Sequence, residues 1–211
     1  MPYTPQAMPA NQIRFDGLSR RFGRLSVLTG VTGEVADGEV LLVTGSNGSG
    51  KSTLLKCLAG LLAPDKGTIA SREGGKSLDA TERRRRVGLV APDLAFYEEL
   101  TAAENLTFFG RLRGFPPARG AELLARVGLP GDRLAGALSS GMRQRLRWCW
   151  ALLHRPRLLL LDEPFQNLDA PGEAVTRELL DEHLAAGGLA VVANPSSIPV
   201  SHVATRLELG S

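Results

Sequence analysis

A glycine-rich segment at residues 45–53 has the composition of a loop that binds phosphate groups. It follows an apolar run at residues 40–43 and precedes residues 54–58, whose leucines recur at helical spacing. Glycines let the backbone curl until successive N–H groups point at one anion, and a helix start adds partial positive charge. A strand, a glycine-rich loop and a helix in this order predict a site for a nucleoside triphosphate rather than a flexible turn.

The polar side chains of this loop have distinct expected roles. We expect the Lys51 ammonium group to reach the β- and γ-phosphates, and the Ser52 hydroxyl to bind Mg²⁺. The predicted nucleotide-binding residues of the loop are Gly45, Ser46, Asn47, Gly48, Ser49, Gly50, Lys51, Ser52 and Thr53.

Two adjacent carboxylates follow a second apolar run. Residues 158–161 are all leucine, and Asp162 and Glu163 come directly after them. Ligands of open α/β sheets bind at the carboxyl ends of the strands, so both carboxylates are expected at the nucleotide. Asp162 would support the Mg²⁺ ion, and Glu163 would orient or deprotonate the attacking water. The pair alone also fits an exposed acidic turn, but the upstream phosphate-binding loop favours the catalytic interpretation.

A helix start upstream of these carboxylates is a third candidate site. Residues 138–145 read Leu-Ser-Ser-Gly-Met-Arg-Gln-Arg, and Ser139 is a natural N-cap for a helix predicted at residues 140–154. The free N–H groups of a helix start favour an anion. Taken alone, this motif is better interpreted as an ordinary capped helix.

The elements that must position these residues alternate between strands and helices. Alternating apolar residues at 13–18 and 27–35, broken by glycines, predict an antiparallel pair of strands. The order of all the elements predicts an α/β fold with an N-terminal antiparallel layer and an inserted helical subdomain. Further strands are predicted at residues 40–44, 68–70, 87–90, 158–161, 189–193 and 206–209, and helices at residues 52–62, 103–112, 119–127, 140–154 and 172–185.

We expect a single domain that spans residues 13–211, after a disordered N-terminal lead at residues 1–12. Its core would comprise residues 13–98 and 155–211, and its helical subdomain about residues 99–154.

The composition limits the classes of protein. Of the 211 residues, 43% are hydrophobic and 22% charged, with a formal net charge of +3, which is ordinary for a globular chain and does not require nucleic acid as a partner. The arginine run at residues 83–86 is interpreted as a solvated helix end. Cys57 and Cys149 lie in apolar helical stretches and are expected to be reduced core residues. No apolar run approaches the roughly 18 residues that span a bilayer, so a partner chain would supply any membrane-spanning part.

The motifs, taken together and in this order, resemble those of the ATP-binding subunits of ABC transporters. The set comprises the glycine-rich loop, the Ser-Gly helix start, Leu-Asp-Glu-Pro at 161–164 and Asn-Leu-Asp at 167–169. The resemblance implies a P-loop NTPase core of the ABC type, with ATP and Mg²⁺ as ligands. It also implies a multi-span membrane subunit on a separate chain, which would hold this chain at the cytoplasmic face of the cell membrane. The loop at residues 91–100 and the helices after it resemble the surface that docks on that subunit.

Further site residues follow from the resemblance alone. In this family two subunits sandwich two ATP molecules, and each ATP contacts one chain's P-loop and the other chain's signature serine. A second ATP-binding subunit, in a homodimer, would thus contact ATP through Ser139, Gly141 and Met142, with Asp169 at the dimer seam. Phe22 matches the aromatic residue that stacks on adenine, and a core or strand phenylalanine is the alternative.

Two positions depart from the family pattern. The family usually has a glutamine where this chain has Pro92, so the usual ligand to Mg²⁺ and water is missing, and Asp93 could substitute as an oxygen ligand. The family also places a histidine after the last core strand, where this chain has Asn194. Asparagine can donate a hydrogen bond to the γ-phosphate but cannot titrate like histidine. We therefore predict that the chain binds nucleotide firmly but hydrolyses it with a reduced turnover. Asn194 is counted among the predicted catalytic residues.

Three functional classes remain. The leading one is an ATPase that powers a membrane transporter. Within it, Gly-Ser-Asn-Gly-x-Gly-Lys and Leu-Asp-Glu-Pro-Phe resemble the haem-exporter ATP-binding subunits of cytochrome c maturation, although many drug and polysaccharide exporter subunits look similar. The second class is a soluble ABC-type ATPase of DNA repair or translation, which usually carries coiled coils, zinc modules or tandem ATPase units. The third is a regulatory partner that binds nucleotide and dimerises but barely hydrolyses ATP, as Pro92 and Asn194 suggest.

Overall fold

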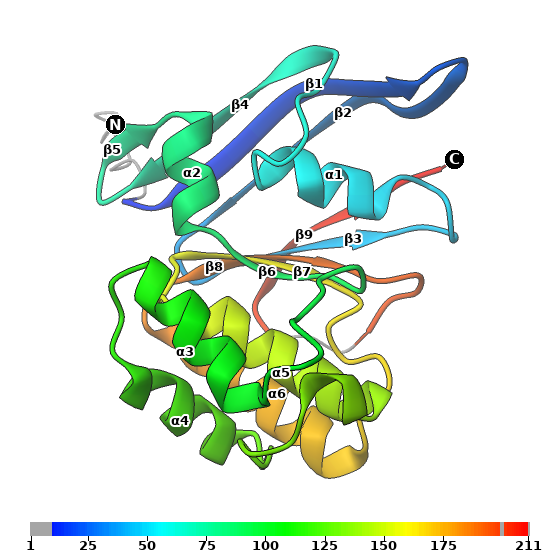
Figure 1. Cartoon of the computed structure of the whole chain (residues 1–211). Helices are drawn as coiled ribbons and strands as arrows, with labels where there is room; N and C mark the ends of the chain where they lie inside the picture. Colours follow the sequence, from blue (N-terminus) through cyan, green and yellow to red (C-terminus); the bar gives the residue numbers. More distant parts are fainter. Residues whose placement is uncertain (1–9, 199–200, 211) are drawn as a thin grey trace.

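The computed structural model describes residues 10–198 and 201–210, which form two sheets and the helices that cover them (Figure 1). The strands are β1 (Gln12–Phe22), β2 (Leu25–Ala36), β3 (Val40–Thr44), β4 (Lys66–Glu73), β5 (Lys76–Leu78), β6 (Gly88–Val90), β7 (Leu158–Asp162), β8 (Leu189–Ala193) and β9 (Val203–Glu208). The helices are α1 (Lys51–Leu58), α2 (Ala80–Arg86), α3 (Ala102–Leu112), α4 (Pro117–Arg126), α5 (Ser140–Leu152) and α6 (Ala170–Ala185), with a short 3₁₀ turn at Ala135–Ala137.

The N-terminal strands form an antiparallel sheet with the order β2-β1-β4-β5. The predicted strand pair is confirmed as β1 and β2, and their register places Ile13 opposite Val35. Alternation along β1 buries Ile13 and Phe15 completely, because successive side chains of a strand point to opposite faces. Strand β5 was not predicted, since its three residues, Lys-Ser-Leu, carry no apolar alternation.

The second sheet has five parallel strands in the order β6-β7-β8-β3-β9. Its inner strands are aliphatic without interruption because both faces of the sheet are covered. In β3, Val40 and Leu42 face one core while Leu41 and Val43 face the other. The predicted α/β fold with an antiparallel layer is thus confirmed, and the strand predicted at 206–209 closes the sheet edge as β9.

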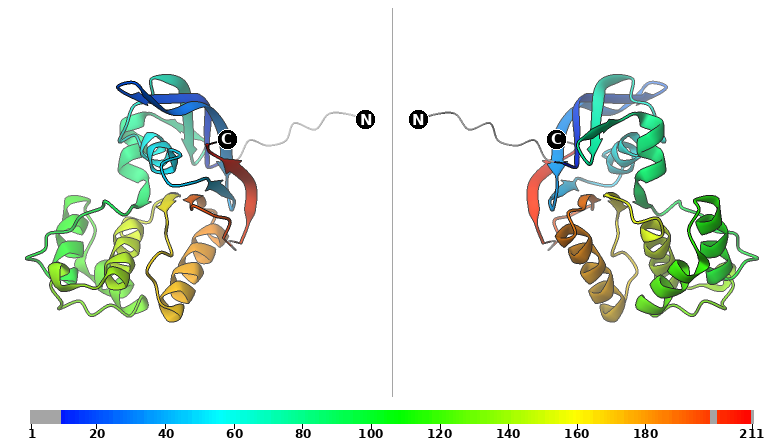
Figure 2. Two further views of the ribbon diagram at one scale, coloured as in Figure 1. Left: turned by 90° about the vertical axis from the view of Figure 1, so that its right-hand side faces the viewer. Right: turned by 90° about the vertical axis from the view of Figure 1, so that its left-hand side faces the viewer.

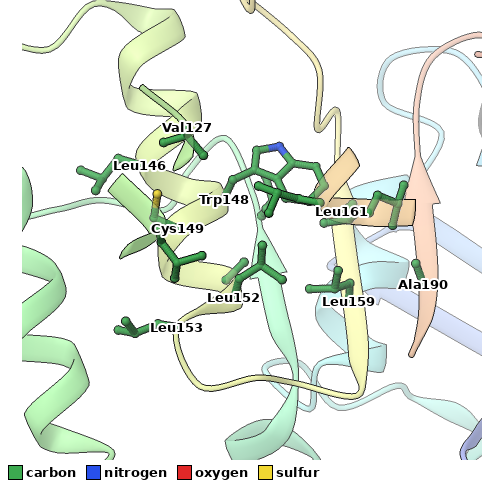
Figure 3. Close-up of a cluster of buried hydrophobic side chains, with 14 of the residues drawn as sticks. Val127, Leu146, Trp148, Cys149, Leu152, Leu153, Leu159, Leu161 and Ala190 are labelled. Carbon is green, nitrogen blue, oxygen red and sulfur yellow. The ribbon is translucent and has the colours of Figure 1, made fainter. Parts of the chain in front are cut away.

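The two faces of the parallel sheet are covered by different elements. On one side lie α1 and the antiparallel sheet, and on the other lie α3 to α6 (Figure 2). Figure 3 shows the second core, in which Trp148 and Leu152 of α5 lie beside Leu159 and Leu161 of β7. Both cysteines are buried and free, as expected.

Several predicted boundaries and one charge assignment are wrong. Helix α1 ends at Leu58 rather than residue 62, because Gly60 turns the chain with a φ of 72° and a Cβ there would lie 2.8 Å from the Ala80 carbonyl oxygen. Of the four arginines at the end of α2, Arg83 is buried rather than solvated, and its Nε donates to the Leu58 carbonyl oxygen at 2.7 Å.

The start of the ordered chain also differs from the expectation. Strand β1 begins at Gln12, and the Asn11 side chain donates to Asp37, so the described structure begins before Ile13. The predicted disordered lead otherwise falls on residues 1–9, which lie outside the described residues. The division into a core and a helical subdomain stays a prediction.

Candidate active site

The loop between β3 and α1 follows a path that only glycine permits at two positions. Gly45 has a φ of 146°, and a Cβ there would lie 2.4 Å from the Leu209 carbonyl oxygen. Gly50 has a φ of 100°, and a Cβ there would lie 2.6 Å from the Val27 carbonyl oxygen. Both backbone conformations are unfavourable for residues with side chains. The loop is therefore held between β2 and the segment after β9.

Lys51 occupies the first turn of α1 and is buried in this loop. Its side chain is only 5% exposed, and Nζ donates to the carbonyl oxygens of Gly45 at 2.6 Å and Ser46 at 2.9 Å. The Ser49 hydroxyl is buried and has no hydrogen-bond partner among the described residues. A buried ammonium group, a helix start and an unpaired hydroxyl together fit the chemistry of a triphosphate.

The end of β7 places a buried carboxylate against α1. Asp162 is 4% exposed, and its pKa is raised, chiefly because burial disfavours the ionised form. A hydrogen bond with Ser52 and the nearby Lys51 charge oppose this shift but do not cancel it. A buried carboxylate beside a hydroxyl is an oxygen donor set that suits Mg²⁺. Two of the three residues predicted to bind the metal, Ser52 and Asp162, are therefore brought together.

Three adjacent strand ends meet at the same edge of the sheet. The Glu163 N–H donates to the Ala193 carbonyl oxygen at 2.9 Å, and the Asn194 N–H donates to the Val43 carbonyl oxygen at 3.0 Å. The structure thus places Asn194 directly beside β3, which carries the P-loop, and Glu163 beside β8, one strand further away. The Asn194 amide donates to the Ser196 carbonyl oxygen at 2.9 Å, so its side chain is engaged by its own loop.

Asp93 reaches α1, but its carboxylate is already paired with a lysine of that helix. Its Oδ2 lies 2.6 Å from Nζ of Lys56, which is four residues after Ser52. Both side chains are substantially exposed, at 63% for Asp93 and 40% for Lys56. Asp93 would have to leave Lys56 in order to reach a metal.

The predicted signature residues form a separate group at the start of α5. The Ser139 hydroxyl accepts the Met142 N–H at 3.2 Å, as expected of an N-cap. A Cβ at Gly141 would lie 2.6 Å from the Asn167 carbonyl oxygen, so this position also requires glycine. Asp169 caps α6 and forms an ion pair with Arg145. Among the described residues, no hydrogen bond or ion pair joins this group to the P-loop.

Phe22 lies at the turn between β1 and β2. Its side chain is 48% exposed, and the Arg20 guanidinium lies 5.0 Å from the centre of its ring. Strand β2 also touches the P-loop, where Val27 approaches Gly50. Phe22 is therefore an exposed aromatic side chain on the hairpin that borders the loop, rather than a core residue.

The sequence did not point to Asn105, which holds the loop at residues 91–100 against α3. Asn105 is fully buried, and it accepts the Tyr97 N–H at 2.9 Å and donates to the carbonyl oxygens of Tyr97 and Thr101, each at 3.0 Å. The loop presents Tyr97, 50% exposed, and its ring centre lies 5.3 Å from that of the exposed Phe108. An asparagine within an apolar helical pattern is the signal that could have revealed this contact.

Comparisons with known proteins agree with this geometry. A family model described as "ABC transporter" matches residues 28–166. The cytochrome c biogenesis ATP-binding export protein CcmA of Nitrosococcus oceani is 40% identical, with 95% of this chain and 92% of that protein covered. The Fe(3+) ions import ATP-binding protein FbpC of Streptomyces coelicolor is 42% identical over 77% of this chain but only 48% of its own length. A solved structure of an ATP-binding subunit of an ABC transporter has a TM-score of 0.75 and 30% identity, and covers 86% of this chain and 79% of that one.

The chain therefore belongs to the family of ABC transporter ATP-binding subunits. Over the part of the chain that the structure describes, no helix has the length and apolar character needed to cross a bilayer.

Proposed function

We propose that this chain binds and hydrolyses ATP in a homodimer, and that a separate multi-span membrane subunit uses the hydrolysis to move a cargo. The observation that carries this proposal is the convergence of Lys51, Asp162, Glu163 and Asn194 on three adjacent strand ends. Membership of the family supports the transporter role over that of a soluble ATPase in DNA repair or translation.

The homodimer is supported by the separation of the two groups of site residues. The Ser139 hydroxyl accepts the Met142 N–H, and Gly141 packs against the Asn167 carbonyl oxygen. Among the described residues, no hydrogen bond or ion pair links this group to the P-loop of the same chain. Helix starts with free N–H groups favour anions. A second copy of the chain would bring this helix start to the ATP held by the first.

The residues of one chain would then divide the reaction between them. The loop N–H groups and Lys51 bind the phosphates, and Phe22 stacks on the adenine. Ser52 and Asp162 would hold Mg²⁺, which neutralises charge on the phosphates when it is bound. Glu163 accepts a proton from the water whose oxygen attacks the γ-phosphorus, and the bond to the ADP oxygen breaks. Asn194 donates a hydrogen bond to the γ-phosphate.

The variant Glu163→Gln tests the base and the dimer together. It should keep ATP affinity, lower turnover by about 10²–10⁴-fold, and accumulate an ATP-bound dimer, because the step that opens the sandwich is blocked. Size-exclusion chromatography with Mg-ATP should show the shift to dimer. The double variant Lys51→Ala/Glu163→Gln is the control, since it should stay monomeric. A Glu163→Gln protein that stays monomeric and hydrolyses ATP normally would contradict both roles.

The second candidate function is that of a regulatory partner that binds nucleotide but hydrolyses it poorly. Asn194 is the observation that favours it. The Asn194 amide is bonded to Ser196, and Pro92 supplies no polar side chain to the site. If these residues limit catalysis, Asn194→His should raise turnover, and Asn194→His/Pro92→Gln should raise it further, because one well-aimed donor is worth about 10²–10³ in rate. If neither variant exceeds the natural protein while all bind ATP equally, turnover is not limited by these positions.

For the cargo we propose haem, moved outward. The cytochrome c biogenesis export protein is matched over 92% of its length, whereas the iron importer is matched over 48%. With the purified membrane complex in vesicles, ferric haem should stimulate ATP hydrolysis and ferric iron should not. Stimulation by ferric iron alone would favour import instead.

A further inference from the structure

Helix α5 sends two buried side chains to the backbone that carries Glu163. Gln144 Nε2 donates to the carbonyl oxygens of Glu163 at 3.2 Å and Pro164 at 2.9 Å, and Trp148 Nε1 donates to that of Pro164 at 2.9 Å. Gln144 is 4% exposed and Trp148 is fully buried, between α5 and Leu161 of β7 (Figure 3). Buried donors on these carbonyls restrict the turn that follows β7.

A third side chain of α5 determines which end of the Gln144 amide faces this turn. Arg147 Nη1 donates to Gln144 Oε1 at 3.0 Å, so the amide nitrogen is left to face the two carbonyl oxygens. Arg147 Nη2 donates to the Pro92 carbonyl oxygen at 2.5 Å. A continuous chain of hydrogen bonds therefore runs from the loop at residues 91–100 to the backbone of Glu163.

Glu163 depends on such support because of its backbone conformation. Its φ of 47° lies in the left-handed region, which residues with a side chain seldom adopt. Conformations of this kind persist where surrounding contacts hold them. The N–H of Glu163 is fixed on Ala193, and its carbonyl oxygen accepts both Gln144 and the Gln166 N–H, at 3.1 Å. Since the backbone sets the direction of the Cα–Cβ bond, these contacts aim the carboxylate.

We propose that Gln144 is a positioning residue for Glu163, and that Arg147 and Trp148 complete an α5 clamp made of these three side chains. The proposal rests on the proposed role of Glu163 as the base. Pro92 stands where the family usually has glutamine, so the loop reaches the catalytic residue through its carbonyl oxygen and Arg147 rather than through a side chain. The α5 clamp affects the rate of hydrolysis without touching ATP.

The variant Gln144→Met tests the clamp, because methionine has a similar length and removes both donors. Turnover should fall by about ten- to a hundred-fold, as small displacements of a catalytic group commonly cost, while ATP affinity stays within about twofold. Trp148→Phe keeps an aromatic ring and removes one N–H, so its effect on turnover should be smaller. Trp150→Phe is the matched control on the same helix, since the Trp150 indole N–H has no acceptor among the described residues.

The decisive measurement repeats Gln144→Met in the Glu163→Gln protein. If Gln144 acts only through Glu163, the residual turnover should fall by less than about twofold, because the group being aimed is already gone. An equal loss in both backgrounds, or an unchanged turnover in the single variant, overturns the positioning role. A Glu163→Gln protein with normal turnover instead overturns the base, and the clamp with it. ATP affinity, measured in each variant, separates these results from misfolding.

Discussion

The two edges of the parallel sheet bury ionisable groups of opposite kinds. At the carboxyl edge, burial raises the pKa of Asp162. At the amino edge, burial lowers the pKa values of His154 and His183, that of His154 to about 4. In each case desolvation disfavours the charged form of the side chain.

The partners of these groups explain why the two edges behave differently. His154 Nε2 lies 3.1 Å from the Val87 carbonyl oxygen and His183 Nε2 lies 3.2 Å from that of Leu189, so each neutral ring is satisfied within the chain. The Ser52 hydroxyl that contacts Asp162 cannot neutralise a carboxylate. The nearby Lys51 charge offsets only part of the cost of burial, since the pKa of Asp162 stays raised, and a bound cation would offset more. At the amino edge, the buried histidines are satisfied by the folded chain itself. At the carboxyl edge, the buried Asp162 favours the binding of a cation.

The largest effect expected at the carboxyl edge comes from Lys51→Ala. Loss of the ammonium group should weaken Mg-ATP binding at least tenfold, or about 1.4 kcal/mol, because charge-assisted bonds to phosphate are strong. Turnover should fall by about 10²–10³-fold. Isothermal titration and a steady-state ATPase assay measure the two quantities. Unchanged ATP affinity would remove the nucleotide site from this edge.

At the amino edge, His154 should make stability depend on pH. Its folded pKa is about 4 and the ordinary value is 6.5, so the unfolded chain binds more protons between these values. The stabilisation is complete above pH 6.5 and is lost as the pH falls towards 4. Between about pH 7.5 and pH 5, urea unfolding of the natural protein should lose about 2 kcal/mol more than that of His154→Gln.

The His154→Gln protein should bind and hydrolyse ATP normally at neutral pH, which makes it the counterpart of Lys51→Ala. If the free energy of unfolding of the variant and of the natural protein depended on pH in the same way, the predicted role of His154 in acid sensitivity would be wrong.

A smaller effect of the reverse sign is expected from Asp162→Asn. Because the folded pKa of Asp162 is raised, its ionised form costs stability, and the cost appears as the pH rises through the folded pKa. Removing the charge should raise the free energy of unfolding of the nucleotide-free protein by about 1 kcal/mol at neutral pH, as at other strained functional sites. Mg²⁺ should then no longer strengthen ATP binding. Destabilisation by this variant would mean that Ser52 and Lys51 already compensate the carboxylate.

The smallest change in stability is expected from Asp93→Asn. Its ion pair with Lys56 is exposed, and pairs of this kind contribute about 0–1 kcal/mol. Asp93 as a metal ligand would instead appear as a higher Mg²⁺ requirement for hydrolysis. A Mg²⁺ titration of the ATPase rate that matches the natural protein would place Asp93 outside the carboxyl-edge site.

The sequence predicted best those parts of the structure that depend on consecutive residues or on a uniformly apolar environment. The strand at Val40–Thr44 was found at its true bounds, since a strand covered on both faces must be aliphatic throughout. The P-loop was equally clear, because its glycines, lysine and hydroxyls are consecutive. The end of α1 was misplaced because the contact that requires Gly60 comes from Ala80, a residue distant in sequence.

The contacts of α5 could not be predicted for a related reason. Gln144, Arg147 and Trp148 all donate to backbone carbonyl oxygens or to one another, and a carbonyl oxygen is present at every residue. No residue type at position 92 or 164 marks it as an acceptor. The sequence gives the donors of such contacts, and only the folded chain gives their partners.

The position of β3 in its sheet also has a consequence for synthesis. This strand carries the P-loop, yet its two neighbours are β8 and β9, and the Leu209 carbonyl oxygen packs against Gly45. A nascent chain that has released only residues 1–188 from the ribosome has β3 with neither neighbour. Long-range pairings of this kind close late, after the entropy of the intervening loop has been lost. Nucleotide can therefore assist folding only after the final strands emerge, and until then the backbone groups on both edges of β3 lack their sheet partners.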